Sequence, residues 1–129
     1  KYENNPDYIE SALKLGFDVE IDIYFYNNCL WLGHDSPKYK IQNNDWLKNN
    51  KLWCHAKNIQ ALDLMLKEKD MHCFWHQEDD CTLTSKGYIW TYPGKELLSK
   101  SIVVLPELYE INKFSNISGI CSDYISKYK

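Results

Sequence analysis

Short apolar segments recur along the chain, and each is followed directly by polar residues. This pattern constrains the fold most, because short segments rich in β-branched and aromatic residues predict strands. Asn27-Asn28 predicts a turn between the first two strands. The predicted strands are Phe17–Tyr24, Cys29–Leu32, Leu52–Ala56, Met71–Trp75, Tyr88–Tyr92, Ser101–Leu105 and Ile117–Cys121.

Two segments predict helices. The first runs from Pro6 to Leu15, with Gly16 as its C-cap, and the second covers residues 58–69, with Asn58 as its N-cap. Thr82–Ser85 predicts a turn or a single helical turn. The apolar faces that we expect are Ile9, Ala12 and Leu13 in the first helix, and Ile59, Leu62 and Leu66 in the second.

Strands that alternate with helices or short crossovers predict a parallel α/β arrangement. The ionisable residues collect at the C-terminal ends of the predicted strands, as they do in (β/α)8 barrel enzymes. A full barrel takes ~250 residues, whereas this chain has 129. We therefore expect one α/β domain over residues 1–129, a compact or incomplete (β/α)8 TIM-like barrel with shortened crossovers. A doubly wound open sheet is the alternative.

Charge and cysteine usage narrow the class of protein. The net charge is −3 and all 15 basic residues are Lys, so we do not expect nucleic-acid binding. The 5 Cys include no C-x-x-C pair, which predicts buried reduced thiols and a cytoplasmic location. No apolar run reaches the ~18–20 residues of a membrane span, and no signal peptide is visible. The oligomeric state stays open.

Glu20-Ile21-Asp22 is the sharpest local signal. Side chains alternate along a strand, so both carboxylates share one face while Val19, Ile21 and Ile23 share the other. If that face is enclosed, a cation must neutralise the two like charges. Oxygen ligands favour a hard divalent ion, Mg²⁺ or Ca²⁺. The alternative is an edge strand with both carboxylates in water.

Two further segments carry candidate chemistry. His34, in the pair His34-Asp35, is a candidate general acid or base, and the alternative is a surface histidine. His55-Ala56-Lys57 offers a ligand and a cation for a phosphate. The alternative for Lys57 is the solvated start of the following helix.

Aromatic and imidazole side chains later in the chain are candidates for the substrate pocket. We expect His76, Trp90 and Tyr92 to contact the substrate together with His55, although Trp75, Trp90 and Tyr92 fit a core equally well. A zinc site is disfavoured because the spacing matches no standard finger. The four residues that would form it are His72, Cys73, His76 and Cys81.

A combined pattern over residues 3–35, about a quarter of the chain, resembles the glycerophosphodiester phosphodiesterases. Their sequences run E-N-T, a helix, G-a-D-x-x-E-x-D, a turn and x-H-D. The later His55-Ala56-Lys57 looks like the family's E-x-K with His in place of Glu, and Ser122-Asp123 looks like its late strand end. The matching segments here are Glu3-Asn4-Asn5-Pro6, Ala12-Leu13, Gly16-Phe17-Asp18-Val19-Glu20-Ile21-Asp22 and Gly33-His34-Asp35.

The resemblance implies a (β/α)8-like barrel that hydrolyses a small-molecule phosphodiester of lipid metabolism. It makes Glu20 and Asp22 ligands of a divalent cation and His34 one half of an acid/base pair. Lys57 would stabilise charge on the phosphoryl group.

The family's other catalytic His lies in an H-R-G segment ahead of E-N-T, whereas this chain opens at Lys1-Tyr2-Glu3. We therefore expect the first barrel strand to be missing. The second His would lie upstream or, as a less favoured substitute, be His55 or His76.

Two other functions stay open at this point. The first is a catalytically impaired module that binds a phosphate or sugar phosphate on the same barrel. The second is a glycosidase that pairs Glu20 with Glu107 or Asp123, for which nothing sets the carboxylate separation.

Overall fold

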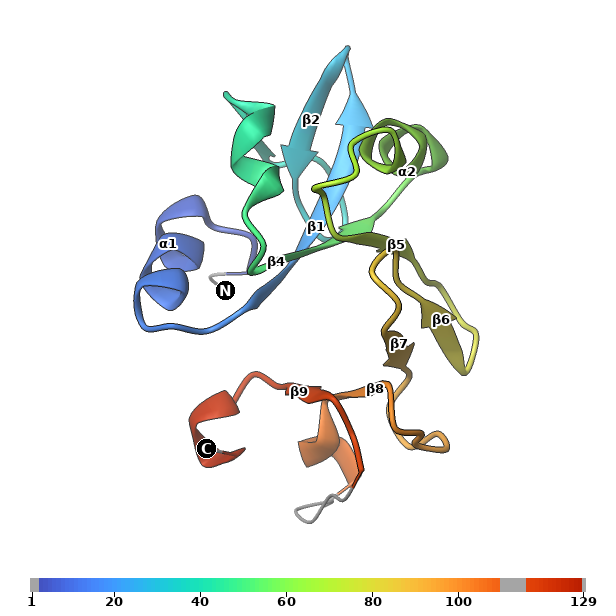
Figure 1. Cartoon of the computed structure of the whole chain (residues 1–129). Coiled ribbons are helices and arrows are strands. Elements are labelled where there is room, and N and C mark those ends of the chain that lie inside the picture. Colours follow the sequence, from blue (N-terminus) through green and yellow to red (C-terminus); the bar gives the residue numbers. More distant parts are fainter. Residues whose placement is uncertain (1–2, 110–115, 129) are drawn as a thin grey trace. The chain divides into compact units, whose positions relative to one another are not determined.

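The computed structural model describes residues 3–109 and 116–128 (Figure 1). The chain forms two compact units, which meet between Trp75 and His76 in the sequence. The expectation of one domain over residues 1–129 stays a prediction.

The first unit contains a five-stranded mixed sheet with the order β3-β2-β1-β4-β5. Strand β1 lies at its centre, antiparallel to β2 and parallel to β4. Outside these pairs, β3 is antiparallel to β2 and β5 is parallel to β4. The elements are α1 (Pro6–Lys14), β1 (Val19–Tyr26), β2 (Cys29–Leu32), β3 (Tyr39–Lys40), η1 (Asn44–Lys48), β4 (Leu52–Ala56), α2 (Ile59–Leu66) and β5 (Cys73–Trp75).

Asparagine residues form one hairpin turn and cap two helices in this unit. Asn27 and Asn28 both have positive φ, of 53° and 64°, as a tight hairpin turn between β1 and β2 requires. Asn5 caps α1 by accepting hydrogen bonds from the backbone N–H groups of Asp7 and Tyr8. Asn58 caps α2 by accepting from Ala61, which confirms the predicted N-cap.

One face of the sheet forms the core with both helices. Ile21 and Ile23 of β1 are buried there, on the face opposite Glu20 as predicted. Helix α2 contacts β1, β4 and β5. The buried residues of α2 are Ala61 and Met65, whereas Ile59 and Leu66 are more than half exposed. The predicted apolar face of this helix is therefore wrong, and only Leu62 of that set packs against the core.

The second unit contains a four-stranded mixed sheet with the order β6-β7-β8-β9. Strands β7, β8 and β9 are parallel, and β6 is antiparallel to β7. The sequence predicted a turn at Thr82–Ser85, but residues 81–83 form β6. The elements are β6 (Cys81–Leu83), β7 (Ile89–Thr91), β8 (Ser101–Val104), η2 (Pro106–Tyr109), β9 (Gly119–Cys121) and η3 (Ile125–Tyr128).

The predicted (β/α)8 TIM-like barrel is wrong. The described residues contain 2 α-helices and 9 strands in two separate mixed sheets, whereas a barrel needs about eight crossover helices. Its strands would all be parallel, but β1–β2 and β6–β7 are antiparallel. The fold is a small mixed α/β fold in which β4 and β5 are joined through α2.

Within the same residues, no helix is long and apolar enough to cross a bilayer.

Candidate metal centre

Strand β1 carries both candidate carboxylates in the middle of the first sheet. Asp22 is 3 % exposed, and Glu20 lies two residues earlier on the same face. Because β1 has a hydrogen-bonded neighbour on each side, the alternative of an edge strand with solvated carboxylates is wrong. The parallel pairing of β1 and β4 ends at Ile23, so Asp22 lies at the carboxyl end of that parallel segment.

Asn4 holds the Asp22 side chain in place. Its side-chain N–H donates to Asp22 Oδ2 over 3.0 Å, and its Oδ1 accepts from the Asp22 backbone N–H over 2.8 Å. Asn4 is buried and has a φ of 62°, a left-handed conformation that asparagine adopts more readily than most residues. These two hydrogen bonds, called the Asn4 clamp below, occupy Asp22 Oδ2 and leave Asp22 Oδ1 for other partners.

His55 of β4 lies beside both carboxylates, because the sheet register places it opposite Asp22. Its Nδ1 lies 3.2 Å from Asp22 Oδ1 and 3.8 Å from Glu20 Oε2. The imidazole stacks on Phe74 of β5, with ring centroids 5.0 Å apart and planes 9° apart. The ring orientation is therefore set from the adjacent strand.

Burial and charge move the pKa values of the two carboxyls in opposite directions. The pKa of Glu20 is raised well above 4.5, first by burial and then by the negative charge of Asp22. Burial also acts to raise the pKa of Asp22, but hydrogen bonds from His55, Asn4 and Glu20 outweigh it and lower that pKa. Glu20 is therefore protonated more readily than an exposed glutamate, and Asp22 less readily than an exposed aspartate.

One atom of the cluster has no hydrogen-bond partner. Glu20 Oε2 is buried and unpaired, although the Glu20 side chain as a whole is 25 % exposed. An unpaired buried carboxylate oxygen is costly unless a proton or a cation compensates it. The donor set of Glu20, Asp22 and His55 therefore fits a divalent cation.

His34 follows β2 and lies near the same aspartate. The nearest ligand atoms of Glu3, Asp22 and His34 lie within 4.8 Å of one another, as do those of Glu20, Asp22 and His55. His34 Nδ1 is 3.0 Å from Asp35 Oδ1 and 3.9 Å from Glu3 Oε1. The imidazole is exposed, so a substrate can reach it.

The turn after β2 positions His34. A Cβ added to Gly33 would lie 1.9 Å from the carbonyl oxygen of Ser36, so only glycine lets the chain fold back this closely. The Gly33 N–H donates to the Asp22 carbonyl oxygen over 3.1 Å, and Tyr24 Oη donates to the His34 carbonyl oxygen over 3.0 Å. Both bonds tie the turn to β1.

Lys57 follows β4 and is partly buried. Its charge lowers the pKa of Glu20, which places it near the carboxylates, but its influence is smaller than that of burial or Asp22. The Lys57 backbone N–H donates to the Ile23 carbonyl oxygen over 2.8 Å. The backbone of this residue is therefore tied to β1, and the role of its side chain stays a prediction.

The remaining candidates belong to the second unit. His76 is buried, its Nε2 lies 2.6 Å from the Asp79 carbonyl oxygen, and its ring lies 5.5 Å from that of Tyr92. Trp90 is 7 % exposed and Tyr92 is 42 % exposed. The substrate-binding roles of these three residues stay predictions.

Two acids named for the glycosidase alternative also lie in the second unit. Glu107 accepts a hydrogen bond from Ser122 Oγ over 2.7 Å, and Asp123 is exposed.

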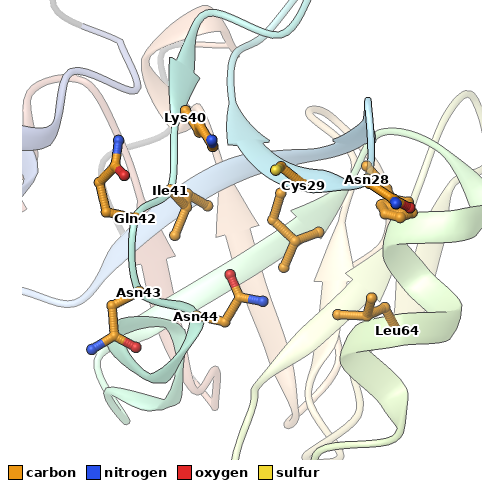
Figure 2. A pocket seen from close by; sticks show the side chains of 10 residues that line it. Asn28, Cys29, Lys40, Ile41, Gln42, Asn43, Asn44 and Leu64 are labelled. Carbon is orange, nitrogen blue, oxygen red and sulfur yellow. The ribbon is translucent and has the colours of Figure 1, made fainter.

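A separate cavity of about 420 Å³ opens on the first unit (Figure 2). Its lining comes from the β1–β2 hairpin, the segment from Lys40 to Asn44 and Leu64 of α2. None of the lining residues belongs to the carboxylate cluster. The cavity is therefore not the candidate site.

Sequence reasoning missed the role of Asn4. It assigned His55 to substrate binding, and the resemblance placed it where the family has a Glu ligand. The E-N-T resemblance marked Asn4 without indicating its contact. A parallel pairing of the two predicted strands would have indicated the contact of His55 with Asp22, since the register of β1 and β4 places these residues opposite each other.

Comparisons with protein-family models, with curated proteins and with solved structures found no match to this chain.

Proposed function

We propose that the first unit is a metal-dependent phosphodiesterase that hydrolyses a glycerophosphodiester or a similar small phosphodiester. The observation that carries the proposal is the buried, unpaired Glu20 Oε2 beside Asp22 and His55. The order of Glu20, Asp22 and His34 along the chain, which resembles the glycerophosphodiester phosphodiesterases, supplies the substrate class.

In this proposal Glu20 and Asp22 hold a divalent cation, with Asn4 keeping the Asp22 carboxylate in position. A bound cation supplies Lewis-acid polarisation of the phosphoryl oxygen. Lys57, whose positive charge acts on Glu20, stabilises charge that develops on the phosphoryl group.

His34 serves as the acid or base. A proton on Nδ1, shared with Asp35, leaves the lone pair of Nε2 to accept a proton from the attacking hydroxyl. A single such proton transfer typically contributes ~10²–10⁴-fold to the rate. The leaving alkoxide takes up a proton from water, and His34 later returns the proton it accepted to the solvent.

Hydrolysis of bis-(p-nitrophenyl) phosphate and of glycerophosphodiesters, with and without EDTA, tests the proposal. We expect EDTA to abolish turnover, and Asp22→Asn to lower it at least ~100-fold while the fold is retained. Asp63→Asn is the matched control, because this carboxylate is exposed on α2 and pairs with Lys67. Turnover that survives both EDTA and Asp22→Asn would refute the proposal.

Binding without turnover is the second candidate. It is favoured by the contact of His55 with Asp22, since an imidazole held there is poorly placed to supply the second proton transfer. Tight, EDTA-sensitive binding of a phosphodiester without hydrolysis would support it over the enzyme.

A further inference from the structure

The ligand atoms of the cluster have spacings that suit a single small ion. Two ligands bonded at ~2.1 Å to a tetrahedral ion lie ~3.4 Å apart. His55 Nδ1 lies 3.2 Å from Asp22 Oδ1 and 3.8 Å from Glu20 Oε2, on either side of that value. These spacings therefore allow the His55 imidazole to bind the same ion as the two carboxylates.

The surroundings hold all three side chains close to this arrangement. Asn4 occupies Asp22 Oδ2, so that Oδ1 faces His55. Phe74 stacks on the His55 ring, and the β1–β4 register fixes the spacing of the two strands. A cation would bind with small side-chain rotations and would give the unpaired Glu20 Oε2 its missing partner.

A nitrogen ligand changes which ion binds best. Imidazole suits first-row transition ions, whereas Mg²⁺ and Ca²⁺ prefer oxygen ligands alone. Three protein ligands with a further open position are also the usual arrangement of catalytic zinc.

We propose that His55 is the third metal ligand, through Nδ1, and that the site selects a first-row transition ion such as Mn²⁺ or Zn²⁺ over Mg²⁺ and Ca²⁺. This inference rests on the metal-binding part of the proposed function and departs from the sequence-based expectation of Mg²⁺ or Ca²⁺. The coordinating His55 is neutral and carries its proton on Nε2.

Calorimetric titration of the full chain with Mn²⁺, Zn²⁺, Mg²⁺ and Ca²⁺ tests the selectivity without any substrate. We expect Mn²⁺ and Zn²⁺ to bind at least ~100-fold more tightly than Mg²⁺. His55→Gln should weaken Mn²⁺ binding at least ~100-fold, since even outer-shell partners are worth ~10–100-fold. His55→Glu should restore binding with all-oxygen ligands and narrow the gap between Mn²⁺ and Mg²⁺.

Pulsed electron paramagnetic resonance of the Mn²⁺ complex reports a nitrogen ligand directly and does not depend on substrate or activity. Coupling of the Mn²⁺ electron spin to a histidine ¹⁴N is expected in the wild-type chain and absent in His55→Glu. A wild-type spectrum without ¹⁴N coupling, or equal affinity for Mn²⁺ and Mg²⁺, would overturn the inference.

The two proposals fail separately. Mg²⁺-dependent turnover without ¹⁴N coupling would refute the role of His55 and leave the phosphodiesterase standing. Mn²⁺ coupled to a histidine nitrogen in a chain that hydrolyses no phosphodiester would support the role of His55 and refute the phosphodiesterase.

Discussion

Glu20 and Asp22 are chemically similar side chains two positions apart, yet their surroundings shift their pKa values in opposite directions. Asp22 accepts hydrogen bonds from Asn4 and His55, whereas Glu20 Oε2 is buried without a partner. The sequence predicted that the two carboxylates share a face, because side chains two positions apart on a strand always point to the same side. It did not predict the Asn4 clamp, because that contact joins residues 18 positions apart.

The raised pKa of Glu20 predicts how the stability of the metal-free protein depends on pH. The folded state binds this proton more tightly than the unfolded chain, so the associated stability is present below pH 4.5 and is lost as pH rises through the folded pKa. In EDTA, we expect wild-type thermal stability to fall across that window relative to Glu20→Gln. Melting curves over a pH series measure the difference, and parallel pH profiles for the two proteins would contradict the assignment.

Adjacent asparagines offer a matched pair of variants. Asn4→Ala removes both hydrogen bonds to Asp22 and should cost about 1–3 kcal/mol in the free energy of unfolding. Asn5→Ala removes the cap of α1 and should cost about 1 kcal/mol. Only Asn4→Ala should also weaken divalent-cation binding, because the Asn5 side chain bonds to the backbone of α1.

Urea unfolding and calorimetric titration of both variants measure these effects. Equal cation affinity in Asn4→Ala and Asn5→Ala would show that the clamp is purely structural.

Strands and turns were the elements most readily predicted. Each predicted strand overlaps an observed one, and Asn27-Asn28 and Asn58 act as predicted because their conformations depend on local sequence. The two-residue β3 and the three-residue β6 were missed, since strands this short carry little alternation. The face of α2 was assigned wrongly because Ala61 is small, while the larger Ile59 and Leu66 dominate the pattern.

The orientation of α2 gives a test at neighbouring positions. Met65 is fully buried and Leu66 is 56 % exposed. Met65→Ala should therefore lower the free energy of unfolding by about 2–5 kcal/mol, and Leu66→Ala by about 0.5 kcal/mol or less. Chemical denaturation measures both. A larger loss of unfolding free energy for Leu66→Ala than for Met65→Ala would mean that the helix packs through the face that the sequence pattern predicted.

At the scale of the whole molecule, the barrel was predicted from where ionisable residues lie, and that pattern does not determine how strands connect. Asp22 and His55 do meet where the parallel pairing of β1 and β4 ends, since any parallel pair brings its carboxyl ends together. Only 2 α-helices occur in the described ranges 3–109 and 116–128, so the connections that a barrel requires are not formed there. The predicted site in the first unit therefore does not depend on the incorrect prediction of a barrel.

Anomalous X-ray diffraction from crystals of the full chain grown with Mn²⁺ tests most directly whether Glu20, Asp22 and His55 bind a cation. We expect one strong anomalous peak within ~2.0–2.3 Å of a carboxylate oxygen of Glu20, of Asp22 Oδ1 and of His55 Nδ1. A cluster without a peak at saturating Mn²⁺, or a peak bonded only to other residues, would contradict the account.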